Sequence, residues 1–251
     1  MQLVILGSAA AVPDAQHENA HLLWLGQQHN ILIDCPGTPL VRLQQAGLDP
    51  HHLTDLVLTH FHPDHVQSAP ALLMGLWLTG RQARLRIHGL AVTIHKLQAL
   101  LDLYEWRTWE GFYPVDFHEL PEDEMYPLLE SETLRVFSSP VEHLIPNIGL
   151  RFELPGRQKT WAYSCDTQPC PAVVRLAKDA DLLLHEASGA HPGHSSPAQA
   201  GQVASQAGAS TLLLIHYPVG PAYQPEQTLQ QARQTFDGKL GLAQDFDVIE
   251  F

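Results

Sequence analysis

The chain has 251 residues, of which 45% are hydrophobic, and its 14 Lys and Arg against 27 Asp and Glu give a formal net charge of −13. This length and apolar content predict one large compact domain over residues 1–251 and exclude disordered and fibrous proteins. The negative charge disfavours a surface that holds nucleic acid mainly by neutralising its phosphates. Three cysteines are too few for a disulfide framework, so we expect reduced thiols in a cytoplasmic protein.

Short apolar runs separated by turn residues open the chain. They predict strands over residues 2–6, 21–25 and 31–33. The last two strands are joined by a short polar turn and should form a hairpin. Residues 3–12 also resemble the apolar centre of a signal peptide, but no Lys or Arg occurs before Arg42, so we interpret them as a buried strand.

A short helix and another buried strand follow. Thr38 as N-cap and Gly47 after the last turn predict the helix over residues 40–46. The strand over residues 55–59 leads directly into the sequence His-Phe-His-Pro-Asp-His. The apolar helix expected after it, to about Leu78, is shorter than the roughly 20 residues that span a bilayer, so no membrane association is expected.

The rest of the chain continues the alternation of apolar runs and polar turns. Strands are predicted over residues 84–88, 134–138, 148–154, 160–164, 182–185 and 212–216. The clearest helix begins at Ser196, where Pro197 and Gln199 complete a capping-box pattern, and it ends at Gly208. Strands that alternate with helices predict a layered α/β domain.

Residues 104–133 break this alternation. The stretch from residue 108 to residue 134 holds eight carboxylates and no Lys or Arg, mixed with aromatic side chains. We expect this segment to be an insertion or a lid near the functional site, where its charge would repel a polyanion.

The strongest chemical signal is the hexapeptide with His60, His62, Asp64 and His65 directly after a buried strand. Neutral imidazole and carboxylate are the usual nitrogen and oxygen ligands of zinc. In a tight turn His60 and His62 can point the same way, while Asp64 and His65 face a neighbouring point. The spacing predicts two adjacent metal ions. Unrelated surface histidines are the alternative, and they would give this hexapeptide by chance in only about a few per thousand chains of this composition.

With these residues the chain resembles the metallo-β-lactamase superfamily of dinuclear metallohydrolases, and within it the ribonuclease Z group. The resemblance extends over nearly the whole chain. Besides the hexapeptide it rests on Leu6-Gly7-Ser8, Leu32-Ile33-Asp34, Glu142-His143, Cys165-Asp166-Thr167, His185-Glu186-Ala187, His194-Ser195-Ser196 and His216. It implies an αββα sandwich of two mixed β-sheets flanked by helices, with the metal ions at one edge of the sheets.

The resemblance also implies the metal ligands. They are His60, His62 and His143 for one zinc ion, Asp64, His65 and His216 for the other, and Asp166 as a bridge between both. From the residues alone, His143 and Asp166 follow predicted strands and His216 ends an apolar run, where a side chain leaves the edge of a sheet. If each of these three residues is considered alone, an ordinary position in the core or on the surface is the alternative to a role as metal ligand. Manganese or iron would suit the same nitrogen and oxygen ligands as zinc.

The chemistry that the resemblance implies is hydrolysis of a phosphodiester by a hydroxide shared between the two metal ions. We expect Asp64 to position and deprotonate this nucleophile. His194 is expected to protonate the leaving alkoxide, with Glu186 holding its other ring nitrogen; an exposed turn histidine is the alternative. Asp34 is expected to hold a ligand histidine in one tautomer, or else to form a simple turn. Cys165 should pack away from the metal ions, because successive strand residues face opposite sides.

Two features disfavour precursor tRNA as the substrate. Residues 12–19 stand where tRNA 3′-processing relatives carry a basic Pro-Thr-Lys-x-Arg-Asn loop; they keep Pro13 and Asn19 but replace the cations with neutral or acidic residues. No segment has the composition of the Gly- and Lys-rich arm of those relatives. We therefore expect an endonuclease-like phosphodiesterase acting on a small or nucleotide-sized ester, with RNA disfavoured as a partner.

Other functions stay open at this point. The same dinuclear site could hydrolyse a carboxylic ester, a lactone or a thioester, because metal ions polarise carbonyl groups as well. A metal-binding or nucleic-acid-binding module without catalysis is a third interpretation, although every implied ligand is present. The apolar helix with Leu72, Leu73, Leu76 and Trp77 predicts a homodimer if its apolar surface is larger than the core of one chain can bury. The alternative is an ordinary buried helix.

Overall fold

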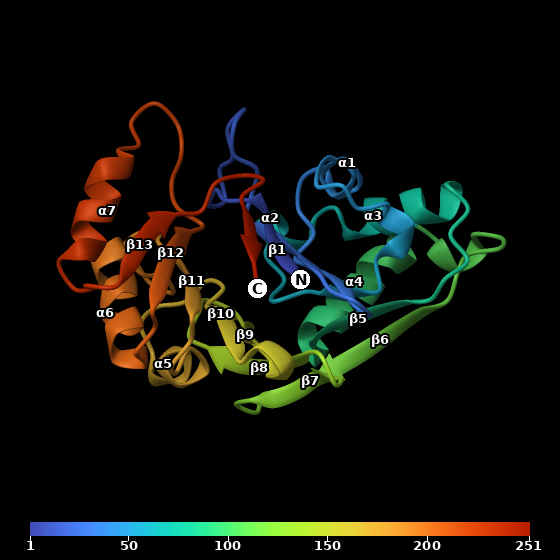
Figure 1. The fold of residues 1–251 in the computed structure, drawn as a ribbon. Helices are drawn as coiled ribbons and strands as arrows, with labels where there is room; N and C mark the ends of the chain where they lie inside the picture. The colour runs from blue at the N-terminus through green and yellow to red at the C-terminus, as the bar shows by residue number, and fades with distance from the viewer.

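Two seven-stranded mixed sheets face each other in the computed structural model, which describes residues 1–251 (Figure 1). The first sheet contains, in spatial order, β14 (Val248–Glu250), β1 (Gln2–Gly7), β2 (His21–Leu25), β3 (Asn30–Ile33), β4 (Asp55–Val57), β5 (Leu85–Leu90) and β6 (Val115–Leu120). The second contains β13 (Lys239–Leu242), β12 (Thr211–Ile215), β11 (Leu182–Glu186), β10 (Lys159–Tyr163), β9 (Asn147–Leu154), β8 (Arg135–Val141) and β7 (Tyr126–Glu130). The predicted αββα sandwich is confirmed.

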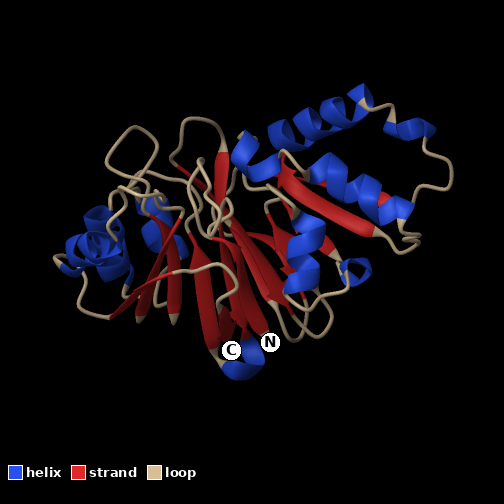
Figure 2. Ribbon diagram, turned by 90° about the horizontal axis from the view of Figure 1, so that it is seen from above, coloured by secondary structure: helices blue, strands red, loops and turns tan.

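Helices cover the outer face of each sheet (Figure 2). The first sheet carries α1 (Pro39–Gln45), α3 (Ala69–Leu78) and α4 (Ala91–Leu103). The second carries α5 (Pro171–Leu176), α6 (Pro197–Ala207) and α7 (Pro225–Arg233). A four-residue helix, α2 (Pro63–Val66), follows β4, and 3₁₀ turns lie at Pro50–His52, Trp106–Thr108 and Pro155–Arg157. None of the helices combines the length and the apolar character that crossing a membrane requires.

The main core lies between the two sheets. Trp24 of the first sheet packs against Trp161 of the second with ring centroids 5.9 Å apart, and Trp161 stacks on Phe152 at 4.0 Å. All three side chains are fully buried. Burying an aromatic side chain of this size contributes on the order of 2–3 kcal/mol, so the contact between Trp24 and Trp161 helps to hold the sheets face to face.

The direction of the strands gathers several loops at one edge of the sandwich. β3 and β4 run parallel in the first sheet, and β10, β11 and β12 run parallel in the second. β8 shares their direction, because it and β10 both pair antiparallel with β9. Parallel strands present their carboxyl ends at the same edge, so the residues that follow these strands meet there.

The expectation of an insertion at residues 104–133 is corrected by the structure. This segment supplies one strand to each sheet: β6 pairs parallel with β5, and β7 pairs antiparallel with β8. Its aromatic residues pack on helix α3, where Trp109 stacks on Trp77 at 5.2 Å between ring centroids. The segment is therefore an edge of both sheets, and its aromatic side chains cover a helix of the first layer.

Helix signals read from the sequence describe α6 well. The Ser196 hydroxyl accepts from the Gln199 backbone N–H at 3.2 Å, the Gln199 side chain accepts from the Ser196 N–H at 2.8 Å, and Gly208 ends the helix with φ 70°. The apolar helix α3 has a different outcome. Its residues Leu72, Leu73 and Leu76 are fully buried in this chain's own core, whereas Trp77 is half-buried, and the homodimer stays a prediction.

Candidate metal centre

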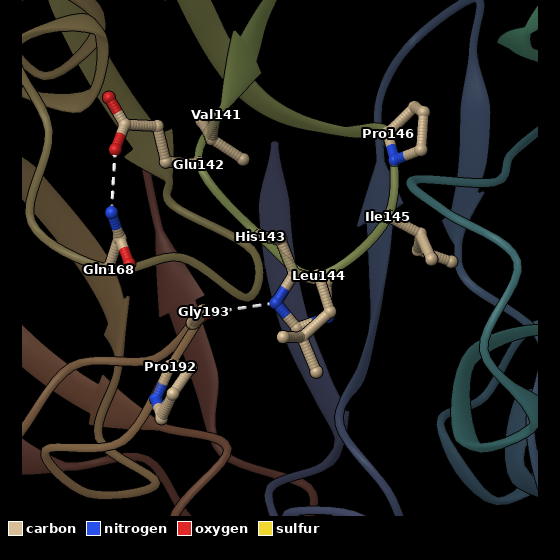
Figure 3. Close-up of a pocket in the computed structure, with 9 residues that line it drawn as sticks. All are labelled: Val141, Glu142, His143, Leu144, Ile145, Pro146, Gln168, Pro192 and Gly193. Carbon is tan, nitrogen blue, oxygen red and sulfur yellow. Dashed lines mark hydrogen bonds between the residues drawn. The ribbon is translucent and has the colours of Figure 1, made fainter.

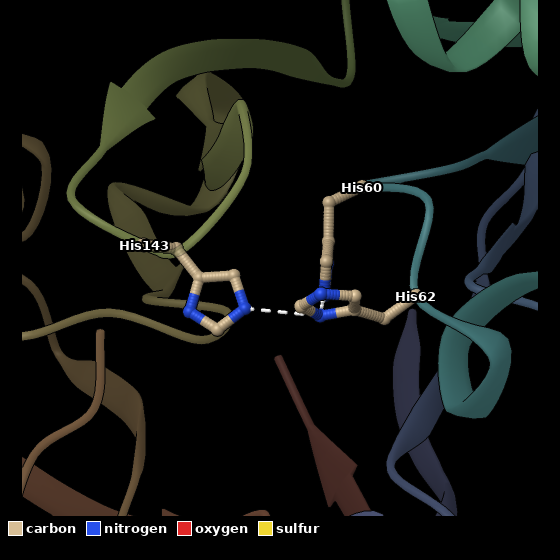
Figure 4. Close-up of side chains that lie close together, drawn as sticks. All are labelled: His60, His62 and His143. Carbon is tan, nitrogen blue, oxygen red and sulfur yellow. Dashed lines mark hydrogen bonds between the residues drawn. The ribbon is translucent and has the colours of Figure 1, made fainter. Parts of the chain in front are cut away.

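Three imidazole rings from both halves of the sandwich converge at the edge where the parallel strands end. The turn between β4 and α2 holds His60 and His62, and His143 follows β8. Figure 4 shows the three rings pointing at one another. Nδ1 of His62 lies 3.0 Å from Nε2 of His60 and 3.1 Å from Nε2 of His143. These three nitrogens surround one point.

A second group lies beside the first. Nε2 of His65 is 3.5 Å from Oδ2 of Asp64, and Nε2 of His216 is 3.4 Å from the same oxygen. Asp166 lies between the two groups, with its Oδ2 3.5 Å from Nε2 of His65 and 4.0 Å from Nε2 of His60. We refer to these residues together as the histidine-aspartate cluster: His60, His62, Asp64, His65, His143, Asp166 and His216.

The spacing of the cluster fits metal ions. A tetrahedral ion with nitrogen ligands at about 2.0–2.1 Å separates those ligands by roughly 3.3 Å, close to the distances found here. Nε2 of His65 and Oδ1 of Asp166 are buried and have no hydrogen-bond partner, which a bound cation would supply. Burial also lowers the pKa of His60, His62 and His143, so these rings are neutral, the form that binds metal. The cluster is therefore suited to two metal ions, each contacted by three side chains, with Asp166 between them.

Asp34 lies behind the cluster, in the loop after β3. Its Oδ2 accepts from Nδ1–H of His65 at 2.8 Å, which turns Nε2 of the ring toward the cluster. Its Oδ1 accepts from the backbone N–H and the hydroxyl of Thr59, both at 2.9 Å. The hydroxyl oxygen of Thr59 lies 3.1 Å from Nδ1 of His60 and can accept its proton. Sequence reasoning missed Thr59, although its position directly before the hexapeptide could have suggested it.

Two further contacts orient the rings of His143 and His216. Nδ1 of His143 donates to the backbone oxygen of Gly193 at 2.8 Å, and Nδ1 of His216 lies 2.8 Å from the hydroxyl of Ser188. No local pattern points to Ser188 or Gly193, because both approach the cluster only through the fold. Both belong to the loop between β11 and α6, so this one loop positions two cluster histidines.

Glu186 and His194 form a pair next to the cluster, as expected from the sequence. Oε1 of Glu186, which is fully buried, lies 3.0 Å from Nδ1 of His194 and accepts from the backbone N–H of Ser195 at 2.9 Å. Burial lowers the pKa of His194, but the hydrogen bond and charge of Glu186 outweigh it, so this pKa is raised overall. The His194 ring lies parallel to that of His216 and edge-on to that of His143, with centroids 6.0 Å and 4.9 Å away.

Cys165 does not follow the expected alternation. It lies beyond the end of β10 in a left-handed conformation with φ 50°, so the two-residue period of a strand no longer applies. Its thiol is fully buried in the core and lies 3.8 Å from Nδ1 of His60. Cys165 therefore packs in the core, as expected, but it also contacts a ring of the cluster.

Two cavities flank the cluster. The His143 cavity, about 520 Å³, has His143, Leu144 and Gly193 close together in its wall, with Ile145 and Pro146 on the other side (Figure 3). Its one charged side chain, Glu142, is hydrogen-bonded to Gln168 at 2.7 Å. His194, whose ring lies beside that of His143, lines a second cavity of about 290 Å³, which we call the His194 cavity.

The walls of the His194 cavity combine small apolar residues with imidazole rings. They are formed by Ala10, Ala11, Val12, Ser188, His191, His194, His216, Pro218 and Val219. The segment after β1 thus reaches the site with alanine and valine side chains. No Lys or Arg lines either cavity.

Comparison with known proteins agrees with this geometry. The family model of the beta-lactamase superfamily domain matches residues 29–217. Ribonuclease Z of Methanothermobacter thermautotrophicus is 26% identical over 94% of this chain and 92% of that protein. The fold is similar to that of the metallo-beta-lactamase fold protein YhfI from Bacillus subtilis, with TM-score 0.84 and 22% identity over 100% of this chain and 98% of that one.

Human tRNase Z, short form, has a similar fold as well, with TM-score 0.80 and 23% identity over 100% of this chain and 99% of that one. The family model covers most of the chain and includes every residue of the histidine-aspartate cluster. The chain belongs to the beta-lactamase superfamily, among its ribonuclease Z-like metal-dependent hydrolases.

Proposed function

We propose that this chain hydrolyses a phosphodiester of small or nucleotide size with two bound zinc ions. In this proposal the ligands are His60, His62 and His143 for one ion, Asp64, His65 and His216 for the other, and Asp166 for both. The converging lone pairs and the unpartnered buried atoms of His65 and Asp166 support this assignment. Manganese and iron are the other metals that this donor set would accept.

The side chains around the cluster have separate roles in the proposed hydrolysis. Metal ions bound there supply Lewis-acid activation of water and of the scissile phosphoryl oxygen. Asp64, whose carboxylate faces the cluster, accepts the proton of the attacking water. His194 donates a proton from Nε2 to the departing oxygen, because its Nδ1 is held by Glu186.

The observation that carries the proposal is the Glu186–His194 pair beside the cluster. An alkoxide is a poor leaving group, and its departure from phosphorus is assisted by a positioned acid. Glu186 is buried and accepts three backbone or ring N–H groups within 3.2 Å through Oε1, so it holds the His194 ring in one orientation. This rigid donor suits a phosphodiester with an unactivated alcohol.

The charge around the site supports a small substrate over precursor tRNA. No Lys or Arg lines the two cavities next to the cluster, and the loop after β1 contributes alanine and valine to one of them. The phosphate groups of an RNA duplex would find no Lys or Arg side chain in these cavities to neutralise their charge. We therefore expect precursor tRNA to be a poor substrate.

The test compares substrate classes with the zinc-loaded and manganese-loaded protein. Bis-p-nitrophenyl phosphate is assayed beside a panel of lactones and thioesters at equal concentration. We expect metal-dependent release of p-nitrophenol at a rate above that of any carbonyl substrate. Turnover of a lactone or thioester without turnover of the phosphodiester would contradict the proposal and point to carbonyl chemistry at the same cluster.

A further inference from the structure

Three of the five tryptophan side chains pack together in a half-buried group outside the metal centre. The indole of Trp77 on α3 stacks on that of Trp109 at 5.2 Å between ring centroids. Phe112 packs edge-on against Trp109 at 5.4 Å and against Trp106 at 5.6 Å. None of these rings lines the His143 cavity or the His194 cavity. They form a separate surface, which we call the aromatic platform: Trp77, Trp106, Trp109 and Phe112.

Exposed apolar side chains adjoin the platform along the chain. Leu78, which follows Trp77, is 67% exposed. Leu103 and Tyr104, which lie shortly before Trp106, are 80% and 57% exposed. An apolar surface that includes tryptophan rings is typical of a protein interface rather than of ordinary solvent-exposed surface.

The indole N–H groups of two platform rings already have acceptors within the chain. Nε1 of Trp77 donates to the backbone oxygen of Glu110 at 3.0 Å, and Nε1 of Trp106 donates to Oδ1 of Asp102 at 2.9 Å. These rings still offer their apolar surface and the negative face of the π-system, which attracts cations. A partner therefore has to bring apolar and cationic groups rather than hydrogen-bond acceptors.

One cation of this chain shows how the platform receives such a group. The guanidinium of Arg107 lies 4.9 Å from the centroid of the Trp106 ring, and its Nε donates to Oδ1 of Asp102 at 3.1 Å. A ring and a carboxylate thus hold the arginine together. Arg107 is the one Lys or Arg among residues 102–114, so the carboxylates beside the other rings have no cation from this segment.

Two of these carboxylates are free to pair with a partner. Glu105 directly precedes Trp106, and Glu110 directly follows Trp109. Both are exposed, and the one ion pair of the segment joins Arg107 to Asp102. Negative charge beside an apolar surface favours a cationic partner and disfavours nucleic acid or an anionic membrane. A second copy of this chain would bring the same carboxylates and a net charge of −13, which repels it.

We propose that the aromatic platform is a docking site for a segment of a partner protein that carries arginine beside leucine. The leucine side chains cover the exposed apolar residues. The arginine side chains lie on the tryptophan rings and pair with Glu105 and Glu110, as Arg107 does with Trp106 and Asp102. This inference does not depend on the proposed hydrolysis, because the platform lies outside both cavities of the metal centre.

The test measures fluorescence anisotropy of a labelled peptide, Leu-Arg-Leu-Leu-Arg-Arg-Leu-Leu-Arg, with the full chain near physiological ionic strength. We expect saturable binding in the micromolar range. Two control peptides carry serine in place of leucine or glutamate in place of arginine, and each should bind at least about tenfold more weakly. Absence of binding would overturn the proposal. Equal binding of the serine peptide would also overturn it, because the net negative charge alone would then explain the attraction.

Matched variants locate the bound peptide. Leu103→Ser should weaken binding by about three- to tenfold through lost apolar contact, whereas Val248→Ser, at an exposed apolar residue of β14, should have no effect. Glu110→Gln should weaken it by about two- to fivefold, the size expected of an exposed ion pair. Glu130→Gln removes an equal charge from β7 and should have no effect. Equal losses in a variant and its control would contradict the platform as the docking site.

Sedimentation velocity distinguishes the other occupant. We expect Leu103→Ser to leave the oligomeric state of the chain unchanged, because the platform is free to receive a partner. A dimer of the unchanged protein that Leu103→Ser dissociates would show that a second copy covers the platform, and it would overturn the proposal. The substituted side chains are exposed, and urea unfolding confirms that each variant is folded.

Discussion

At the scale of single residues, the site depends on hydrogen bonds to the ring nitrogens that face away from the cluster. Asp34 accepts from His65 directly and from Thr59, whose hydroxyl reaches His60. One buried carboxylate thereby orients two rings. Such outer bonds typically change metal affinity by about 10- to 100-fold when they are removed.

Thr59→Val keeps the shape of the side chain and removes its hydroxyl. We expect zinc affinity to fall by about tenfold, because Nδ1 of His60 loses the acceptor that fixes its tautomer. Competition with a chromophoric chelator measures this affinity. Thr54→Val is the matched control, because the Thr54 hydroxyl also bonds a buried carboxylate, that of Asp55, outside the cluster. Equal affinity losses in both variants would contradict the role of Thr59.

His194→Ala tests the proton donor. Turnover of a dinucleoside-type diester, whose alkoxide leaves poorly, should fall by about 10²- to 10⁴-fold, whereas p-nitrophenyl esters, which leave without a proton, should lose far less. Steady-state rates on both substrates with equal zinc content give the comparison. A loss of the same size on both would show that His194 acts in some other way.

At the scale of elements, a group of charged and polar side chains around the buried Asp55 joins strands β4 and β5 at the end of β4 away from the metal centre. Asp55 on β4 pairs with Arg86 at 2.7 Å and with His88 at 2.9 Å, both on β5. Burial raises the pKa of Asp55, but hydrogen bonds from His29 and His88 and the charge of Arg86 lower it far below its ordinary value. Because the pKa is lower in the folded state, Asp55 stabilises the fold above the unfolded-state pKa of about 4, and this stabilisation is lost as the pH falls below it.

Asp55→Asn should therefore destabilise the protein by roughly 1.5–3 kcal/mol at pH 7, because the hydrogen bonds to the buried carboxylate are lost while Arg86 stays partly exposed to solvent. The difference from the unchanged protein should shrink as the pH falls toward 3. Urea unfolding at several pH values measures both effects. Asp116→Asn, which breaks an exposed pair with Arg84, is the control and should cost less than about 1 kcal/mol. A difference between Asp55→Asn and the unchanged protein that does not depend on pH would contradict this account.

The elements also show what the sequence can and cannot predict. The inner strands and α6 were predictable, because continuous apolar runs and a capping box are local signals. β6 was not, because it is an edge strand with mostly half-buried or exposed side chains, and only its pairing with β5 makes it a strand. In the site, the hexapeptide was visible as a contiguous pattern. Ser188 and Gly193 act on the cluster only through contacts between distant segments, which composition and spacing do not encode.

At the scale of the whole molecule, the metal centre spans both halves of the sandwich. His60, His62, Asp64 and His65 follow a strand of the first sheet, whereas His143, Asp166 and His216 follow strands of the second. Metal ions bound by both sets would connect the two sheets at this edge. Binding to the folded state alone stabilises a protein by about 2.7 kcal/mol when the free ligand is at 100 times its dissociation constant.

Removal of metal with a chelator should therefore lower Tm by several degrees, and zinc should restore it. Differential scanning calorimetry at fixed protein concentration measures the shift. The Asp166→Asn variant should show a smaller shift, because it lacks the charge shared by both ions. No change in Tm on chelation, for protein shown to contain metal beforehand, would contradict a centre that joins the sheets.

The most direct test of the central claim is the metal content of the protein, measured by plasma emission after reconstitution with zinc and removal of free ions. The histidine-aspartate cluster predicts two equivalents per chain, falling to one or fewer in Asp166→Ala. Protein that retains no metal, or a stoichiometry that Asp166→Ala leaves unchanged, would contradict the dinuclear centre on which the proposed hydrolysis depends.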